Sequence, residues 1–153
     1  MGVASTRISP ELRAQRHASR AGSTYKRFLD DLCEDAGWSS EEAERRALAV
    51  IAALEAILPP REAHGLFAQL PSRLRERVAY EPEPERIPPS NAEAFLGRVA
   101  TVLDVDPDDV DAIVRMVFRA LRLHMSSGGA RAIEACLPDD LRRLWNPPPF
   151  GRR

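Results

Sequence analysis

The stretch AQLPSRLR at residues 68–75 returns as ACLPDDLR at residues 135–142, an offset of 67 positions from residue 68 to residue 135. The same offset, carried upstream without a gap, pairs apolar positions with apolar positions. These pairs are Phe28 with Phe95, Leu29 with Leu96, Leu32 with Val99, Val50 with Val117, Ile51 with Phe118, and Leu54 with Leu121. A fixed period shared by apolar positions, turn positions and a proline is typical of two copies of one supersecondary unit. The sequence therefore predicts a duplicated domain.

Within each copy the apolar residues recur every three or four positions and never alternate, which predicts helices and no sheet. We expect an all-α fold of two tandem pseudo-symmetric four-helix repeats, preceded by an N-terminal helix. In the first copy the helices are expected over residues 24–36, from Ser39 or Ser40 to Leu58, over 60–70, and onward from Pro71. In the second copy they are expected over residues 91–103, 107–125, 128–136 and 138–146.

Composition divides the chain into five segments. A basic N-terminal extension, residues 1–23, carries four arginines against one glutamate, and Ser9-Pro10 and Gly22 indicate a helix over about 10–21. Helical repeats over residues 24–80 and 91–146 flank a linker over 81–90, in which four prolines alternate with charged residues. Residues 147–153 form a proline-rich, basic tail.

The Leu-Pro turn within the repeated stretch is expected to be structural. Pro71 and Pro138 fit the first position of a helix, where a missing N–H costs nothing, and Leu70 and Leu137 before them are expected to be buried. The residues expected in the core include Phe28, Leu54, Phe95 and Leu121.

Charge and hydropathy exclude several classes of protein. The 153 residues have a formal net charge of −1; residues 24–80 carry eight basic and ten acidic side chains, and residues 91–146 carry seven and nine. Neither repeat has the basic footprint of a nucleic-acid domain. No apolar run reaches the roughly twenty residues of a membrane span, and residues 1–22 lack the hydrophobic region of a signal peptide. We therefore expect a cytoplasmic protein without a membrane partner.

An acidic stretch that begins at Asp104 has the alternating carboxylates that open a calcium-binding loop. The pattern then fails, because position six is Asp109 where such loops need glycine, and position twelve is Arg115 where they need glutamate. Asp106 followed by Pro107 fits a capped helix start instead. The stretch is therefore interpreted as a helix start.

The histidines and cysteines also stand apart from other candidate ligands. No Cys, Asp or Glu lies at ligand spacing from His64 or His124, and Cys33 and Cys136 fall at non-equivalent positions of the two copies. The sequence thus predicts no catalytic residues, no metal and no cofactor, and we expect that the protein is not an enzyme.

The candidate partner-binding residues lie at the two ends of the chain. In the expected N-terminal helix four basic side chains share one face, and in the tail an aromatic residue precedes two arginines. The alternative interpretations are a solvated helix face and a frayed chain end. The residues concerned are Arg13, Arg16, His17, Arg20, Phe150, Arg152 and Arg153.

One face differs between the long helices of the two copies. In the second copy Arg115, Arg119 and Arg122 form a polar stripe, which is expected to be solvated. The same offsets in the first copy are largely apolar, so we expect this face to be covered, either by the N-terminal helix or by a second copy in a homodimer. The residues of this face are Leu48, Ala49, Ala52 and Ala56.

Three motifs are shared by the copies. They are Phe28-Leu29, Glu41-Glu42-Ala43-Glu44 and Gln69-Leu70-Pro71 to Leu74-Arg75, kept as Phe95-Leu96, Asp108-Asp109-Val110 and Leu137-Pro138 to Leu141-Arg142. With these motifs, residues 24–146 resemble the bacterial family called domain of unknown function 2267, although Cys136 departs from the glutamine. The resemblance implies a duplicated helical fold and a bacterial setting. It implies no activity, cofactor or catalytic residue.

Three functions stay open from the sequence. A non-enzymatic helical protein-interaction or adaptor module ranks first. Nucleic-acid binding through the arginine-rich N-terminal helix is an alternative, against which the acidic repeats argue. A small-ligand binder or enzyme that uses the cleft between the copies is a second alternative. The expected partner is a protein, and a homodimer stays open.

Overall fold

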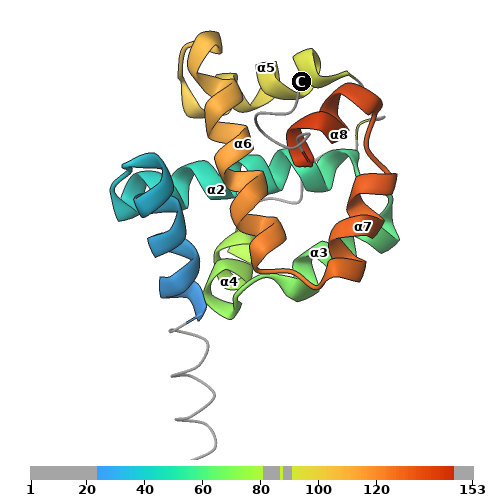
Figure 1. Cartoon of the computed structure of the whole chain (residues 1–153), viewed down its shortest axis with the longest axis horizontal. Coiled ribbons are helices and arrows are strands. Elements are labelled where there is room, and N and C mark those ends of the chain that lie inside the picture. The colour runs from blue at the N-terminus through green and yellow to red at the C-terminus, as the bar shows by residue number, and fades with distance from the viewer. Residues whose placement is uncertain (1–23, 81–86, 88–90, 147–153) are drawn as a thin grey trace, which may run out of the picture.

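The computed structural model of the chain describes residues 24–80, 87 and 91–146. These residues form eight helices and no strand, of which the first spans residues 24–36 (Figure 1). The others are α2 (Ser40–Ile57), α3 (Pro60–Gln69), α4 (Ser72–Tyr80), α5 (Ala92–Leu103), α6 (Pro107–Leu123), α7 (Ser127–Ala135) and α8 (Asp139–Trp145). The predicted all-α fold is confirmed, and the expected helix over 10–21 lies outside the described residues.

The two long helices begin at side-chain caps. The Ser39 hydroxyl accepts a hydrogen bond of 3.2 Å from the backbone N–H of Glu42 at the start of α2. At the start of α6 the Asp106 carboxylate accepts one of 3.0 Å from the N–H of Asp108, and Pro107 takes the first helical position. Each cap satisfies an N–H that has no partner within the helix. The interpretation of the acidic stretch as a helix start is confirmed.

The Leu-Pro turns differ from the prediction by one residue. Pro71 and Pro138 directly precede α4 and α8, and their carbonyl oxygens accept the first helical hydrogen bonds, from Arg75 N (2.9 Å) and Arg142 N (2.8 Å). The prolines therefore cap the helices instead of standing at the first helical position. The preceding leucines of both turns are buried, as predicted.

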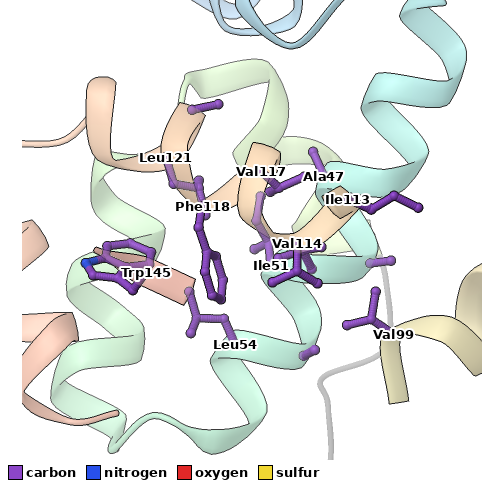
Figure 2. Close-up of a cluster of buried hydrophobic side chains, with 14 of the residues drawn as sticks. Ala47, Ile51, Leu54, Val99, Ile113, Val114, Val117, Phe118, Leu121 and Trp145 are labelled. Carbon is purple, nitrogen blue, oxygen red and sulfur yellow. The ribbon is translucent and has the colours of Figure 1, made fainter. Parts of the chain in front are cut away.

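The core lies where α2 crosses α6 (Figure 1). Ile51 and Leu54 of α2 and Phe118 and Leu121 of α6 are fully buried there (Figure 2). The Phe118 ring meets the buried Trp145 ring edge-on, with centroids 5.1 Å apart. Aromatic pairs prefer this geometry, which adds to the burial of their area. The four residues predicted for the core are confirmed, since Phe28 and Phe95 are buried as well.

The remaining helices surround this crossing. α5 packs against both α2 and α6, α4 packs on α2, α8 packs on α6, and α3 lies against α7. Helix 24–36 reaches α6, because Asp35 pairs with Arg119 at 3.9 Å and Asp31 contacts His124. Nowhere in residues 24–80 or 91–146 is a helix long and apolar enough to cross a membrane.

Candidate binding groove

A groove of about 360 Å³ opens between the last turn of helix 24–36, the start of α2 and the first half of α6. Both halves of the chain, residues 24–80 and 91–146, contribute to it, because α2 and α6 cross beneath it. Its lining consists of Asp35, Ala36, Trp38, Arg46, Val105, Asp109, Ala112, Ile113 and Met116.

Two left-handed residues place the apolar side chains of this groove. Gly37, at φ 73°, ends helix 24–36, and its N–H donates to Cys33 O at 2.8 Å. Asp104, at φ 55°, ends α5 in the same way. Helices commonly end on a left-handed residue because it turns the chain and satisfies the last carbonyls. Trp38 and Val105 directly follow these two residues, so both turns direct an apolar side chain to the groove.

Arg46 forms a fixed wall of the groove. Its guanidinium carbon lies 4.7 Å from the centroid of the Trp38 ring, and the group pairs with Glu42 at 3.2 Å. The side chain of Arg46 is only 16% exposed. Cation–π stacking and the ion pair hold both Arg46 and Trp38 in place. The positive charge of Arg46 is balanced by Glu42, so it adds little net charge to the groove.

The rim of the groove is acidic. Asp35 and Asp109 are exposed at its two sides. The segments that turn around it, residues 34–42 and 104–111, hold four and five carboxylates and no lysine or arginine. Part of this acidity has a local reason, since carboxylates in the first turns of α2 and α6 face the positive ends of the helix dipoles. Three of the nine carboxylates have an arginine partner, namely Asp35 with Arg119, Glu42 with Arg46 and Asp111 with Arg115. The other six are Glu34, Glu41, Asp104, Asp106, Asp108 and Asp109.

This arrangement supplies the chemistry of a binding site. Trp38, Val105, Ile113 and Met116 offer an apolar surface, and the carboxylates offer charge at the edge. Among the described residues that line the groove there is no histidine, cysteine, serine or threonine that would act beside a carboxylate as a nucleophile or base. Within the described ranges no three His, Cys, Asp or Glu side chains gather to hold a metal ion.

The site residues predicted at the chain ends lie outside the described residues. Arg13, Arg16, His17 and Arg20 belong to residues 1–23, and Phe150, Arg152 and Arg153 belong to residues 147–153. Their roles stay predictions.

The predicted apolar face of α2 is partly covered by α5. Ala49 and Ala56 are buried, whereas Leu48 and Ala52 are half-buried. At one end of this face Arg45 Nη1 donates to Leu103 O at 3.5 Å, and at the other the N–H of residue 87 donates to Ala56 O at 2.9 Å. The contact of Arg45 with Leu103 and the packing of α5 on α2 place α5 along this side of α2, and residue 87 adds a contact from outside α5. Additional cover by residues 10–21 or by a second copy stays a prediction.

The arginine stripe of α6 is solvated only in part. Arg115 and Arg119 are exposed, as predicted. Arg122 is half-buried, and its Nε has no hydrogen-bond partner among the described residues. Burial lowers the pKa of Arg122, the charge of Arg119 lowers it further, and Glu134 opposes both. The expected solvated stripe therefore does not extend to Arg122, which is half-buried and is close enough to Glu134 of α7 to feel its charge.

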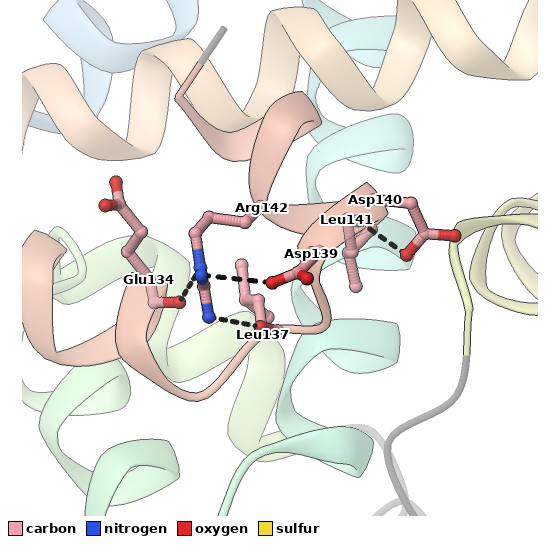
Figure 3. Close-up of polar contacts among 6 residues, drawn as sticks. All are labelled: Glu134, Leu137, Asp139, Asp140, Leu141 and Arg142. Atoms are coloured by element: carbon pink, nitrogen blue, oxygen red, sulfur yellow. Dashed lines mark hydrogen bonds and ion pairs between the residues drawn. The ribbon is translucent and has the colours of Figure 1, made fainter.

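The arginine of the Leu-Pro-x-x-Leu-Arg motif caps a helix. Arg142 Nε donates to Glu134 O at 3.2 Å and Nη2 donates to Leu137 O at 3.0 Å, while Asp139 pairs with Nη1 at 3.2 Å (Figure 3). The accepting carbonyls lie at the end of α7, where helical carbonyls lack partners. Sequence reasoning missed this role, although the position of the arginine one residue after a buried leucine was a usable signal.

The glutamine of the same motif joins the two halves. Gln69 Oε1 accepts a hydrogen bond of 2.8 Å from the N–H of Ser126, at the start of α7. A Cβ at Gly129 would lie 2.0 Å from Gln69 Nε2, so glycine leaves room for the amide. At the position offset by 67, burial and then the charge of Glu62 raise the pKa of the Cys136 thiol. The raised pKa disfavours the reactive thiolate.

Tyr25 is part of a third polar cluster. Its hydroxyl donates to Glu44 Oε1, and Arg77 Nε pairs with the same oxygen at 3.0 Å. Burial and the hydrogen bond to Glu44 raise the pKa of Tyr25 above its usual range. The cluster ties helix 24–36, α2 and α4 together, which is a structural role.

Comparison with known families gives one match. A family profile described as an uncharacterized conserved protein (DUF2267) matches residues 25–144, well over half of the 153-residue chain. A search of curated proteins finds no match. The matched range includes every helix that lines the groove and both Leu-Pro turns. The chain belongs to the DUF2267 family.

Proposed function

We propose that the two halves of the chain are copies of one four-helix unit. The helix bounds support this, because an offset of 67 moves 40–57 to 107–124, 60–69 to 127–136 and 72–80 to 139–147. The corresponding helices are α6 (Pro107–Leu123), α7 (Ser127–Ala135) and α8 (Asp139–Trp145). Each differs by no more than two residues from the shifted bounds.

Contacts between the halves support the same proposal. Gln69 of the first half contacts Gly129 of the second half. An offset of 67 relates Gln69 to Cys136 and Glu62 to Gly129, and Cys136 and Glu62 are neighbours as well. Exchanged pairs of this kind are expected of a two-fold relationship between equivalent units. In this proposal the groove lies near the pseudo-two-fold axis, since its lining includes the equivalent pairs Trp38 with Val105 and Arg46 with Ile113.

We propose that the protein is a non-enzymatic interaction module and that the groove binds an arginine- or lysine-bearing protein segment with an apolar anchor residue. The observation that carries this proposal is the apolar floor within an acidic rim. Trp38 and Met116 would contact the anchor, and Asp109 would face the cations together with Asp35, whose present partner is Arg119 at 3.9 Å. Interfaces commonly place a desolvated apolar anchor at the centre and charges at the edge.

The two parts of the groove would contribute differently. Burial of one large apolar side chain contributes roughly 1.5–3 kcal/mol. Each exposed ion pair at the rim contributes about 0.2–1 kcal/mol and is screened by salt. The anchor would therefore supply most of the affinity, whereas the carboxylates would select basic partners and accelerate association.

A peptide taken from this chain's own tail tests the proposal. The probe is a synthetic peptide with the sequence of residues 147–153, which places Phe150 before Arg152 and Arg153. The chain has two tryptophans, Trp38 and Trp145, so NMR of the two indole N–H groups separates the groove from the core. We expect the peptide to shift the Trp38 signal and to leave the signal of the buried Trp145 unchanged.

Two controls sharpen this experiment. A peptide with Phe150→Gly, or with both arginines replaced by glutamate, should bind much more weakly. In the protein, Asp35→Lys with Asp109→Lys should abolish the shift, whereas Glu76→Lys with Glu93→Lys should preserve it. Glu93 is a suitable control because it is also a first-turn carboxylate, on α5. No change at Trp38 with any arginine-bearing peptide, or equal binding by the groove variant, contradicts the proposal.

A further inference from the structure

We infer that the groove of one molecule binds the arginine-bearing N-terminal segment, residues 1–23, of a second copy, so that copies associate head to tail. The inference rests on the proposed function, because it names the basic segment that the groove would take. Its support is an unusual separation of charge along the described part of the molecule.

The charged side chains of helix 24–36 are arranged in the order that its helix dipole disfavours. Lys26 and Arg27 stand in its first turn, and Glu34 and Asp35 stand in its last. Helix dipoles favour the opposite order, with carboxylates at the start and cations at the end. The Lys26–Asp30 pair, at 2.9 Å, also has the weaker orientation, with the cation N-terminal to the acid. The side chains therefore add to the helix dipole and make one end positive and the other negative.

Helix α4 strengthens the positive end. It holds Arg73, Arg75 and Arg77 against Glu76, and it lies beside the start of helix 24–36 (Figure 1). Burial, the largest effect, raises the pKa of Tyr25, and the charges of Arg77 and Arg73 oppose it, which places both guanidinium groups near this end of the helix. The negative end is the acidic rim of the groove, to which the helix contributes Asp35.

The N-terminal segment has the chemistry that the groove requires. Residues 1–23 contain four arginines and one glutamate, with Leu12 directly before Arg13. An apolar residue flanked by cations matches an apolar floor flanked by carboxylates. The segment joins the described protein at Thr24, at the positive end of the helix.

The point of attachment favours a second copy over the same molecule. Helix 24–36 is about 18 Å long at 1.5 Å per residue, and the groove lies at its far end. To fill its own groove, the segment would have to span the whole length of this helix from Thr24. A second copy can place its acidic rim next to the segment without that constraint. The contact joins two different surfaces, so it would generate chains or rings.

Sedimentation velocity of the full-length protein over a concentration series tests the inference. We expect the wild-type protein to associate beyond a dimer as its concentration rises. Association should weaken by roughly an order of magnitude from 0.1 to 1 M salt, as the Debye length falls from about 10 to about 3 Å. The variants Arg13→Glu with Arg16→Glu and Arg20→Glu, and separately Asp35→Lys with Asp109→Lys, should raise the dissociation constant at least tenfold.

A mixture of two neutral variants gives the decisive result, namely Arg13→Gln with Arg16→Gln and Arg20→Gln, and Asp35→Asn with Asp109→Asn. Neutral side chains are needed because a glutamate-bearing segment would itself attract a lysine-bearing groove. The segment variant keeps an intact groove, and the groove variant keeps an intact segment, so together they should form a one-to-one heterodimer that does not grow. Control variants should still associate like the wild type: Arg131→Glu with Arg143→Glu, and Glu93→Lys. All three control positions lie outside the groove lining.

Three results would overturn the inference. The first is a wild-type protein that stays monomeric, and the second is a mixture that forms no heterodimer. The third is a monomer whose Trp38 indole signal shifts when the arginines of its own segment are reversed, which would place the segment in the same molecule. If peptide binding at Trp38 persists in any of these cases, the proposed function stands without the inference. If it fails as well, both are wrong.

Discussion

The side chains of His124 and Asp31 meet across the two halves of the chain, with Nε2 2.7 Å from Oδ2. His124 caps the end of α6 and is only 13% exposed, and the ring of Phe28 contacts its imidazole edge-on at 5.4 Å between centroids. The pair therefore anchors helix 24–36 to α6. It has no counterpart in the other half, because the equivalent positions hold Ile57 and Arg98.

Removal of this contact should destabilise the protein. We expect Asp31→Asn to lower the free energy of unfolding by about 1–3 kcal/mol, since the half-buried imidazole loses a charged hydrogen-bond partner. The neighbouring variant Asp30→Asn is the control, because its partner Lys26 is exposed and such pairs contribute about 1 kcal/mol or less. Urea denaturation measures both. Equal losses in the two variants would show that the His124 contact contributes no more to stability than the exposed Lys26–Asp30 pair.

Two leucines of α6 offer a similar comparison in the core. Leu121 is fully buried, whereas Leu123 is 62% exposed. Leu121→Ala should cost roughly 2–5 kcal/mol, because it removes packed methyl groups and leaves a cavity. Leu123→Ala should stay within about 0.5 kcal/mol of the wild type. Chemical denaturation that fails to separate these two variants would contradict the core described for α6.

The fold could be predicted from the sequence because its signals are local. Caps such as Ser39 and Asp106, and stops such as Gly37, act within one helical turn, and the apolar spacing directly reflects burial. The groove could not be predicted in the same way. Trp38 lines the same groove as Val105 and Met116 only because the two halves of the chain pack together, which no single segment encodes. A signal did exist, since Trp38 and Val105 are equivalent under the offset of 67 and each follows the residue that ends a helix.

Arg142, the arginine of the Leu-Pro-x-x-Leu-Arg motif, should contribute to stability, whereas its neighbour Arg143 should not. Arg142→Ala removes the side-chain donors to Glu134 O and Leu137 O, although Glu134 O keeps its bond from the N–H of Leu137 at 3.1 Å. Hydrogen bonds of charged groups contribute about 1.5–3 kcal/mol each. Part of this loss will be recovered by water, so we expect a total of about 1–3 kcal/mol. Arg143→Ala, at an exposed position, should change stability by less than about 0.5 kcal/mol. Arg142→Lys should not rescue, because an ammonium group lacks the planar fork.

Two adjacent glycines of α7 should respond differently to alanine. Nothing lies within 4 Å of a Cβ at Gly128, so Gly128→Ala should stabilise the helix by up to about 1 kcal/mol. Gly129→Ala should gain less, or lose, because the Gln69 amide must move and give up its bond to Ser126, which contributes about 0.5–1.5 kcal/mol. In a Gln69→Ala background the two substitutions should become equivalent. A persistent difference there would place the cost of Gly129→Ala elsewhere.

The Cys136 thiol should be slow to react near neutral pH. Burial raises its pKa and the charge of Glu62 adds to this, so the reactive thiolate forms only at higher pH than for a free cysteine, whose pKa is about 8.5. Iodoacetamide labelling followed by mass spectrometry would measure the rate at Cys136 separately from Cys33. Because the folded pKa is raised, ionisation is disfavoured in the native state, and stability should fall as pH rises through that pKa. Glu62→Gln removes the second cause and should shift the labelling profile of Cys136 to lower pH, while Glu134→Gln should leave it unchanged. An unchanged profile in Glu62→Gln would mean that burial alone protects the thiol.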